Sequence, residues 1–194
     1  MKNKVLLLGV FFNLLSCASG QLVLDNSQLR PYKDMSQVTT MSNTKVLINL
    51  VAVNDKRVNE SIGTGYSGVQ YTPTPVFLQE KVSLYLQSYF KDAFAIRNIQ
   101  VSSESSKELE IDIDELLVEE RIEKHNPEKA FCRGKITYHL SVGTEKWSGT
   151  FWTEYLSAGD LSDGTERLAP TFASCMNELV EKLVTNEEFK NLIL

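Results

Sequence analysis

Three stretches in the second half of the sequence alternate apolar and polar side chains with a period of two residues. Residues 109–113 alternate Leu and Ile with Glu and Asp, and residues 136–142 and 147–155 continue the pattern. Side chains of a β-strand point to opposite faces in turn, so this period predicts strands with one buried and one solvated face. Residues 143–146 have the composition of a hairpin turn, and Gly149 would leave room for a neighbouring side chain.

One more strand and one helix are predicted upstream. Residues 46–53 form a nearly continuous apolar run rich in β-branched side chains, which is typical of a strand buried on both faces. Thr74 and Pro75 read as the N-cap and first position of a helix that carries apolar residues at helical spacing up to Phe94. Residues 54–74 between them read as a long glycine-rich loop.

Two helices are expected at the C-terminal end. Pro170 fits the start of the first, and Thr185 with Glu188 forms a capping box for a short second one. The predicted order is strand, helix, three strands, helix, with the first two strands parallel and the later ones antiparallel. We therefore expect residues 45–194 to form a single α+β domain with two layers: a four-stranded mixed sheet with helices packed on one face.

The N-terminus has the pattern of a secretory signal. Residues 1–4 are basic, residues 5–15 are mostly apolar, and a small residue, Ser16, precedes Cys17. The apolar run is too short to span a bilayer, which takes about 20 residues. The cysteine directly after this run resembles a bacterial lipobox, which implies that Cys17 is lipidated and becomes the first mature residue. An ordinary signal peptide cleaved after Ser19 or Gly20 is the alternative.

This reading divides the chain into three parts. Residues 1–16 are the lipoprotein signal peptide, residues 17–44 are the lipidated cysteine with a flexible tether, and residues 45–194 are the folded domain. Residues 22–24 are the apolar exception within the tether, and an edge strand there is the alternative. Ala18 after the cysteine, in place of Asp, resembles an outer-membrane address.

Charge and motifs exclude several classes of function. Without Lys2 and Lys4 of the signal, 18 basic residues stand against 25 acidic ones, so binding to nucleic acid is not expected. The acidic residues of 108–120 read as a solvated strand face, and His139 as a surface residue. Sequence signatures of hydrolases are missing, so we expect a non-enzymatic protein without metal or cofactor.

The two other cysteines have two readings. In an oxidising compartment, Cys132 and Cys175 are predicted to form a disulfide; two buried free thiols are the alternative. A nucleophilic role would need a nearby base, and the chain has only His125 and His139.

The predicted loop over residues 54–74 is the expected contact surface for a partner. It follows a central strand, its glycines permit close backbone approach, and Tyr66 and Tyr71 are aromatic anchors of the kind enriched at interfaces. Asp55 and Arg57 are candidate contact residues as well. The alternative for these two is that they pair with each other or with the domain and only pin the loop.

A family resemblance rests on short motifs in this order. Asp55-Lys56-Arg57 follows the apolar strand, Ile62-Gly63 comes next, and a helix, an alternating strand and an aromatic hairpin lead to Phe189-Lys190. Together with the lipobox, this pattern resembles the YajG-like family of uncharacterised bacterial lipoproteins. The resemblance implies an outer-membrane lipoprotein of unassigned activity.

These observations give two functional expectations. The first is a membrane-anchored, non-enzymatic binding or assembly module of the cell envelope, whose partner is another envelope protein or envelope component. The second is an accessory lipoprotein subunit of an envelope lipid or lipopolysaccharide transport system. In both, the lipid anchor holds the protein at the bacterial outer membrane with its body facing the periplasm, and surface exposure is an open alternative.

Overall fold

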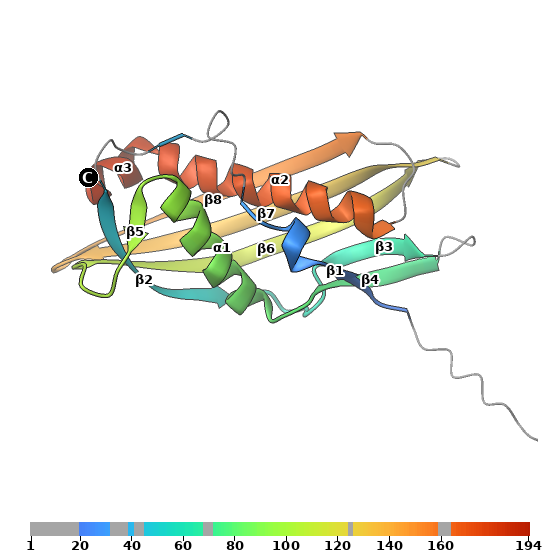
Figure 1. Ribbon diagram of the computed structural model, residues 1–194, viewed down its shortest axis with the longest axis horizontal. Helices are drawn as coiled ribbons and strands as arrows, with labels where there is room; N and C mark the ends of the chain where they lie inside the picture. Colours follow the sequence, from blue (N-terminus) through green and yellow to red (C-terminus); the bar gives the residue numbers. More distant parts are fainter. Residues whose placement is uncertain (1–19, 32–38, 41–44, 68–71, 124–125, 159–163) are drawn as a thin grey trace, which may run out of the picture.

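The computed structural model describes residues 20–31, 39–40, 45–67, 72–123, 126–158 and 164–194. An eight-stranded mixed sheet lies behind the helices, which cover one of its faces (Figure 1). The strands are β1 Leu22–Leu24, β2 Val46–Asp55, β3 Gly63–Ser67, β4 Thr72–Leu78, β5 Ile99–Val101, β6 Lys107–Glu123, β7 Asn126–Val142 and β8 Glu145–Ala158. The helices are the 3-10 turn η1 Asn26–Gln28, α1 Val82–Ile96, α2 Gly164–Thr185 and α3 Glu187–Ile193.

The 17-residue strand β6 organises the sheet because it is long enough to pair with two strands placed end to end. Its first half runs parallel to β2, and its second half runs parallel to β3. Its other side pairs along its length with the antiparallel strand β7, and β8 follows. Strand β5 extends the sheet beyond β2, while β4 and then β1 extend it beyond β3.

The predicted four-stranded sheet is wrong, because the structure has eight strands. Residues 54–74 are not one long loop, since this stretch contains β3 and the start of β4. Pro75 lies in β4, not at a helix start, and Pro73 lies in the same strand. Among the described residues, β1 pairs with β4 from Val76 onward and β3 alone pairs with the part of β4 that holds both prolines, so their missing N–H groups are tolerated there.

Four element boundaries also differ from the predicted ones. Helix α1 begins at Val82, and α2 begins at Gly164 and contains Pro170. The charged residues around 119–129, predicted as a loop, belong mostly to the ends of β6 and β7. Asn186, not Thr185, caps α3, because its side chain accepts a hydrogen bond from the N–H of Phe189.

Several predicted elements are confirmed. The apolar run forms β2, the parallel arrangement of β2 with β6 and the antiparallel order of β6, β7 and β8 are as expected, and the turn between Val142 and Glu145 is a hairpin. Gly149 does leave room for a neighbour: a Cβ atom there would lie 2.5 Å from the ring of Tyr138, which is buried.

The N-terminal segment packs on the domain. Residues Leu22–Leu24 form β1, which is the alternative that the sequence left open for this part of the predicted tether. Leu24 and Leu29 are fully buried, and the hydroxyl of Tyr85 on α1 donates a hydrogen bond to the carbonyl of Leu29. Burial also raises the pKa of the Tyr85 phenol, so this donor keeps its proton. The first described residues are therefore fixed to the sheet and to α1.

Candidate functional site

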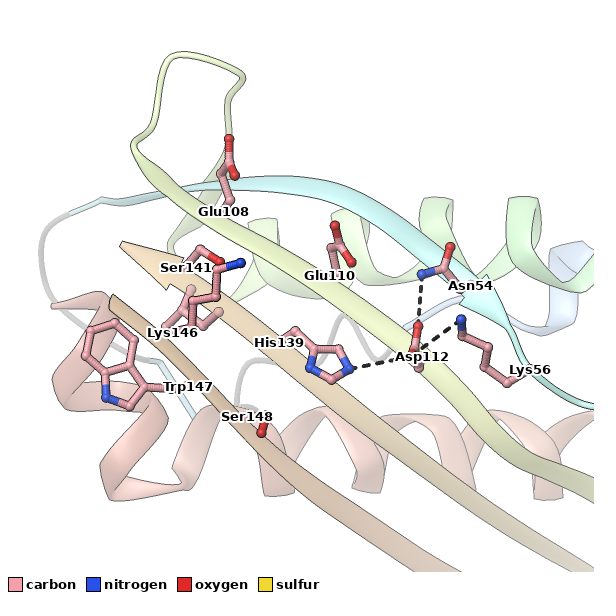
Figure 2. A pocket seen from close by; sticks show the side chains of 11 residues that line it. Asn54, Lys56, Glu108, Glu110, Asp112, His139, Ser141, Lys146, Trp147 and Ser148 are labelled. Atoms are coloured by element: carbon pink, nitrogen blue, oxygen red, sulfur yellow. Dashed lines mark hydrogen bonds and ion pairs between the residues drawn. The ribbon is translucent and has the colours of Figure 1, made fainter. Parts of the chain in front are cut away.

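The face of the sheet opposite the helices carries a polar groove of about 420 Å³ across β2, β6, β7 and β8. Leu109 and Ile111 of β6 are fully buried in the core, so the alternating residues between and beyond them point to this open face. Side chains from four strands converge on the groove (Figure 2). Its lining residues are Asn54, Lys56, Glu108, Glu110, Asp112, His139, Leu140, Ser141, Lys146, Trp147 and Ser148.

The strand register brings these side chains together. Asn54 at the end of β2 is the partner of Asp112 in β6, and Glu110 in β6 is the partner of His139 in β7. Lys56 follows β2 directly, and its backbone N–H donates to the carbonyl of Ile113, which extends the pairing past the end of the strand.

Asp112 is the centre of the groove's polar cluster. Asn54 Nδ2 donates to Asp112 Oδ1 at 2.9 Å, while Lys56 Nζ lies 3.8 Å and His139 Nε2 lies 3.4 Å from Asp112 Oδ2. The Asp112 carboxylate is largely buried by these neighbours, whereas Lys56 and His139 remain about half exposed. Figure 2 shows Asn54 and Lys56 reaching Asp112 from the end of β2, and His139 reaching it from β7. The cluster therefore fixes the floor of the groove and leaves two basic side chains accessible.

The rim of the groove carries charges that the described part of the chain does not neutralise. No hydrogen bond or ion pair within the described residues involves the side chains of Glu108, Glu110 or Lys146. These charges are solvated in the free protein and are available to a partner of opposite charge. Among the described residues, no group of three metal-ligating side chains is placed to hold an ion. The chemistry that the groove offers is thus hydrogen bonding and charge pairing with both signs.

Asp55 and Arg57 pair with each other, which is the alternative reading of these two residues. Arg57 Nε and Nη2 donate to the two carboxylate oxygens of Asp55, both at 2.8 Å, and Nη1 donates to the carbonyls of Ser61 and Leu116. The Arg57 side chain is only 7% exposed. This arginine therefore ties the turn after β2 to the middle of β6 and has little surface left for a partner.

We expect Arg57→Ala to lower the free energy of unfolding by about 2–3 kcal/mol, because it removes a bidentate pair and two hydrogen bonds to backbone carbonyls. Arg57→Lys keeps the charge but not the planar fork, so its effect should be intermediate. Urea unfolding of the three proteins measures the difference. Equal stability of the alanine variant and the native chain would show that the pair does not pin the turn.

Of the other two predicted contact residues, Tyr66 and Tyr71, only Tyr66 lies within the described residues. Tyr66 lies in β3, where its backbone N–H donates to Glu120 Oε2 at 2.7 Å, and its side chain is partly exposed. Tyr71 and Cys17 lie outside the described residues. A contact role for the two tyrosines stays a prediction.

Cys132 in β7 and Cys175 in α2 are buried free thiols in this structure, and their side chains share a hydrogen bond. Burial raises the pKa of the Cys132 thiol well above its usual value, and the neighbouring Cys175 acts in the same direction. The two positions face each other across the contact between β7 and α2. Formation of the disulfide itself stays a prediction, which alkylation of the native protein followed by mass mapping would test.

Sequence reasoning missed the groove. The sequence pattern places Asp112 on a solvated acidic strand face and predicts His139 as a surface residue, and both predictions treat a strand by itself. The cluster depends on the register between β2, β6 and β7. The alternation of residues within one strand gives no information about that register. The available signal was the position of Asn54 and Lys56 at the end of an apolar strand, where parallel sheets tend to place polar sites.

Comparison with known proteins identifies a family but no activity. Residues 31–194 match the family model described as "Uncharacterized lipoprotein". The crystal structure of protein XCC0632 from Xanthomonas campestris is similar at 10% identity with a TM-score of 0.51, covering 88% of this chain and 95% of that one. An uncharacterised protein of known structure is 12% identical with a TM-score of 0.42, covering 73% of this chain and 94% of that one. No curated protein matches the chain.

Proposed function

This chain belongs to the family of uncharacterised lipoproteins, and on that basis we propose that it is a non-enzymatic binding or assembly module of the bacterial cell envelope. In this proposal Cys17 carries the lipid, the anchor sits in the outer membrane, and the body faces the periplasm. The YajG-like motifs, Asp55 to Arg57 and Ile62-Gly63, are consistent with this placement. Among the described residues, no helix is long and apolar enough to cross a membrane.

The observation that carries the binding role is the groove on the open face of the sheet. A two-layer protein buries one face of its sheet under helices, and here the opposite face presents a fixed polar floor around Asp112 with rim charges that have no partner among the described residues. Such a surface suits a polar partner better than an apolar ligand. We assign Glu108 and Glu110 to basic groups of an envelope protein, and Lys56 to its acidic or carbonyl groups.

The position of the anchor relative to β1 fits this role. Cys17 lies five residues before Leu22, the first residue of β1, and five residues span at most about 18 Å when fully extended. A lipid on Cys17 would therefore hold the β1 side of the domain close to the membrane surface. The free spacer between the lipid and the domain would then end at β1 and would be much shorter than the expected tether of residues 17–44. The domain would present its groove at a restricted distance from the bilayer.

We expect Glu110→Lys to reduce the amount of the envelope partner that co-purifies with the affinity-tagged chain after crosslinking in intact cells by about tenfold. The reason is that a like charge would then face the partner's basic group. Glu104→Lys makes the same change of charge at an exposed turn outside the groove and is the matched control. Both variants should melt at the temperature of the native chain, since both side chains are exposed. Equal losses for the two variants, or no loss for either, would remove the groove from the proposal.

A further inference from the structure

Strand β8 leaves a long edge of the sheet unpaired. Within the described residues β8 pairs with β7 alone, over 14 residues without a register shift, and its sequence contains no proline. The other two outer strands, β1 and β5, have three residues each. Short edges, bulges and prolines are three of the means by which proteins prevent strand addition, and β8 has none of these three. In Figure 1 it forms the margin of the sheet on the side of β7 away from β6.

One hydrogen bond shows which backbone groups face outward. Lys182 Nζ on α2 donates to the carbonyl of Trp152 at 2.9 Å, so this carbonyl points away from β7. Because backbone groups of a strand alternate in direction, the N–H and C=O groups of Ser148, Thr150 and Glu154 also point to the free edge. The side chains of the same residues lie on the open face of the sheet, where Trp152 is 60% exposed.

We propose that two copies of this chain pair through β8, antiparallel, about a two-fold axis at Thr150. In this register the outward-facing residues meet each other as hydrogen-bonded pairs: Thr150 faces Thr150 of the second copy, and Ser148 faces its Trp152. The Trp152 carbonyl then accepts from the Ser148 N–H of the second copy in place of Lys182. A two-fold interface of this kind is self-complementary and closes after two copies.

Charge selects this register. Lys146, which has no partner among the described residues of its own chain, lies opposite Glu154 of the second copy, and symmetry repeats the pair. Glu154 already accepts from Arg133 through one oxygen, which leaves its second oxygen for the lysine. If the two-fold axis moves by one residue, to position 149 or to position 151, Lys146 lies opposite Trp152 or Leu156 of the second copy. Neither neighbouring register therefore pairs it with a carboxylate.

The other face of the strand fits the same register. Gly149 comes to lie opposite Phe151 of the second copy, and neither residue brings a charge into the interface; the space beside Gly149 is filled by Tyr138 of its own chain. Lys146 and Ser148 also line the groove, so the second copy would add Trp152 and Glu154 next to its rim. The interface thus joins two open faces into one continuous surface. This inference rests on β8 alone and does not depend on the proposed function.

The test places a cysteine on the two-fold axis of the full-length protein in intact cells. In the proposed register the Cα atoms of two residues at position 150 lie about 5.5 Å apart, whereas two residues at position 148 lie about 14 Å apart. A short bismaleimide should therefore join Thr150→Cys chains into a dimer and leave Ser148→Cys chains monomeric. Cys132 and Cys175 are buried and react in neither case.

Charge variants test the register with the same readout. Adding Lys146→Glu to Thr150→Cys should lower the crosslinked fraction about tenfold, because two attractive pairs become repulsive, and adding Glu154→Lys as well should restore it. Thermal melting of each variant confirms that it is folded. Equal crosslinking at positions 148 and 150, no crosslinking at position 150, or no response to Lys146→Glu would each overturn the proposal.

Discussion

Replacing Gly63 with alanine is expected to prevent the domain from folding stably. A Cβ atom at this position would lie 1.6 Å from the carbonyl oxygen of Val118 in β6, and the glycine has a φ of +157°. Its neighbour Ile62 is fully buried, with its N–H bonded to Val76 and its carbonyl accepting from Val118. The clash is with backbone in the centre of the sheet, so no side-chain rotation can relieve it.

The expected loss of stability is about 4 kcal/mol or more, which is a large part of the 5–15 kcal/mol that stabilises a typical domain. Gly143→Ala is the control: Gly143 also has a positive φ, +62°, but its Cβ would meet no atom within 4 Å. That change should cost only about 1 kcal/mol of backbone strain. Soluble yield and urea unfolding measure both variants, and a Gly63→Ala protein as stable as the control would refute the role of this contact.

Replacing Cys17 with serine is expected to remove the protein from the membrane fraction completely. Serine cannot form the thioether through which a lipobox cysteine receives its lipid, and the described domain contains no helix that could hold the chain in a bilayer by itself. Labelling cells with a palmitate analogue should mark the native chain and leave the Cys17→Ser variant unmarked. Cys132→Ser is the matched control and should keep both the label and the membrane location. Label on the Cys17→Ser variant would end the lipoprotein assignment of this residue.

The sequence predicts strands well where their pattern is local. The alternation at Leu109–Ile113 and the apolar run before Asn54 identified β6 and β2, since each reports burial along one strand. β3 and β4 were missed because Gly63, Gly65, Pro73 and Pro75 signal loops and helix starts. Here the glycines permit close approach to β6 and to Leu22, and the prolines occupy a part of β4 that pairs with β3 alone among the described residues.

The candidate site could be predicted less well than the fold. The pairing of Asp55 with Arg57 was visible as an alternative because the residues are two positions apart. The cluster of Asn54, Asp112 and His139 was not, because its members come from three strands and meet only through the register. The free edge of β8 also required the whole strand order, since its alternating pattern is the same as that of a central strand.

Position-resolved crosslinking in intact cells tests the central claim, that the open face of an anchored domain binds an envelope partner. A photocrosslinking amino acid replaces Ser141 in the groove, and in a second strain it replaces Ser88, an exposed serine on α1 on the helical side of the sheet. Mass spectrometry then identifies the captured molecules. The account predicts a discrete adduct with an envelope protein from position 141, none from position 88, and loss of the adduct when Glu110→Lys is added. The same adducts from both positions, or no adduct from position 141, would contradict it.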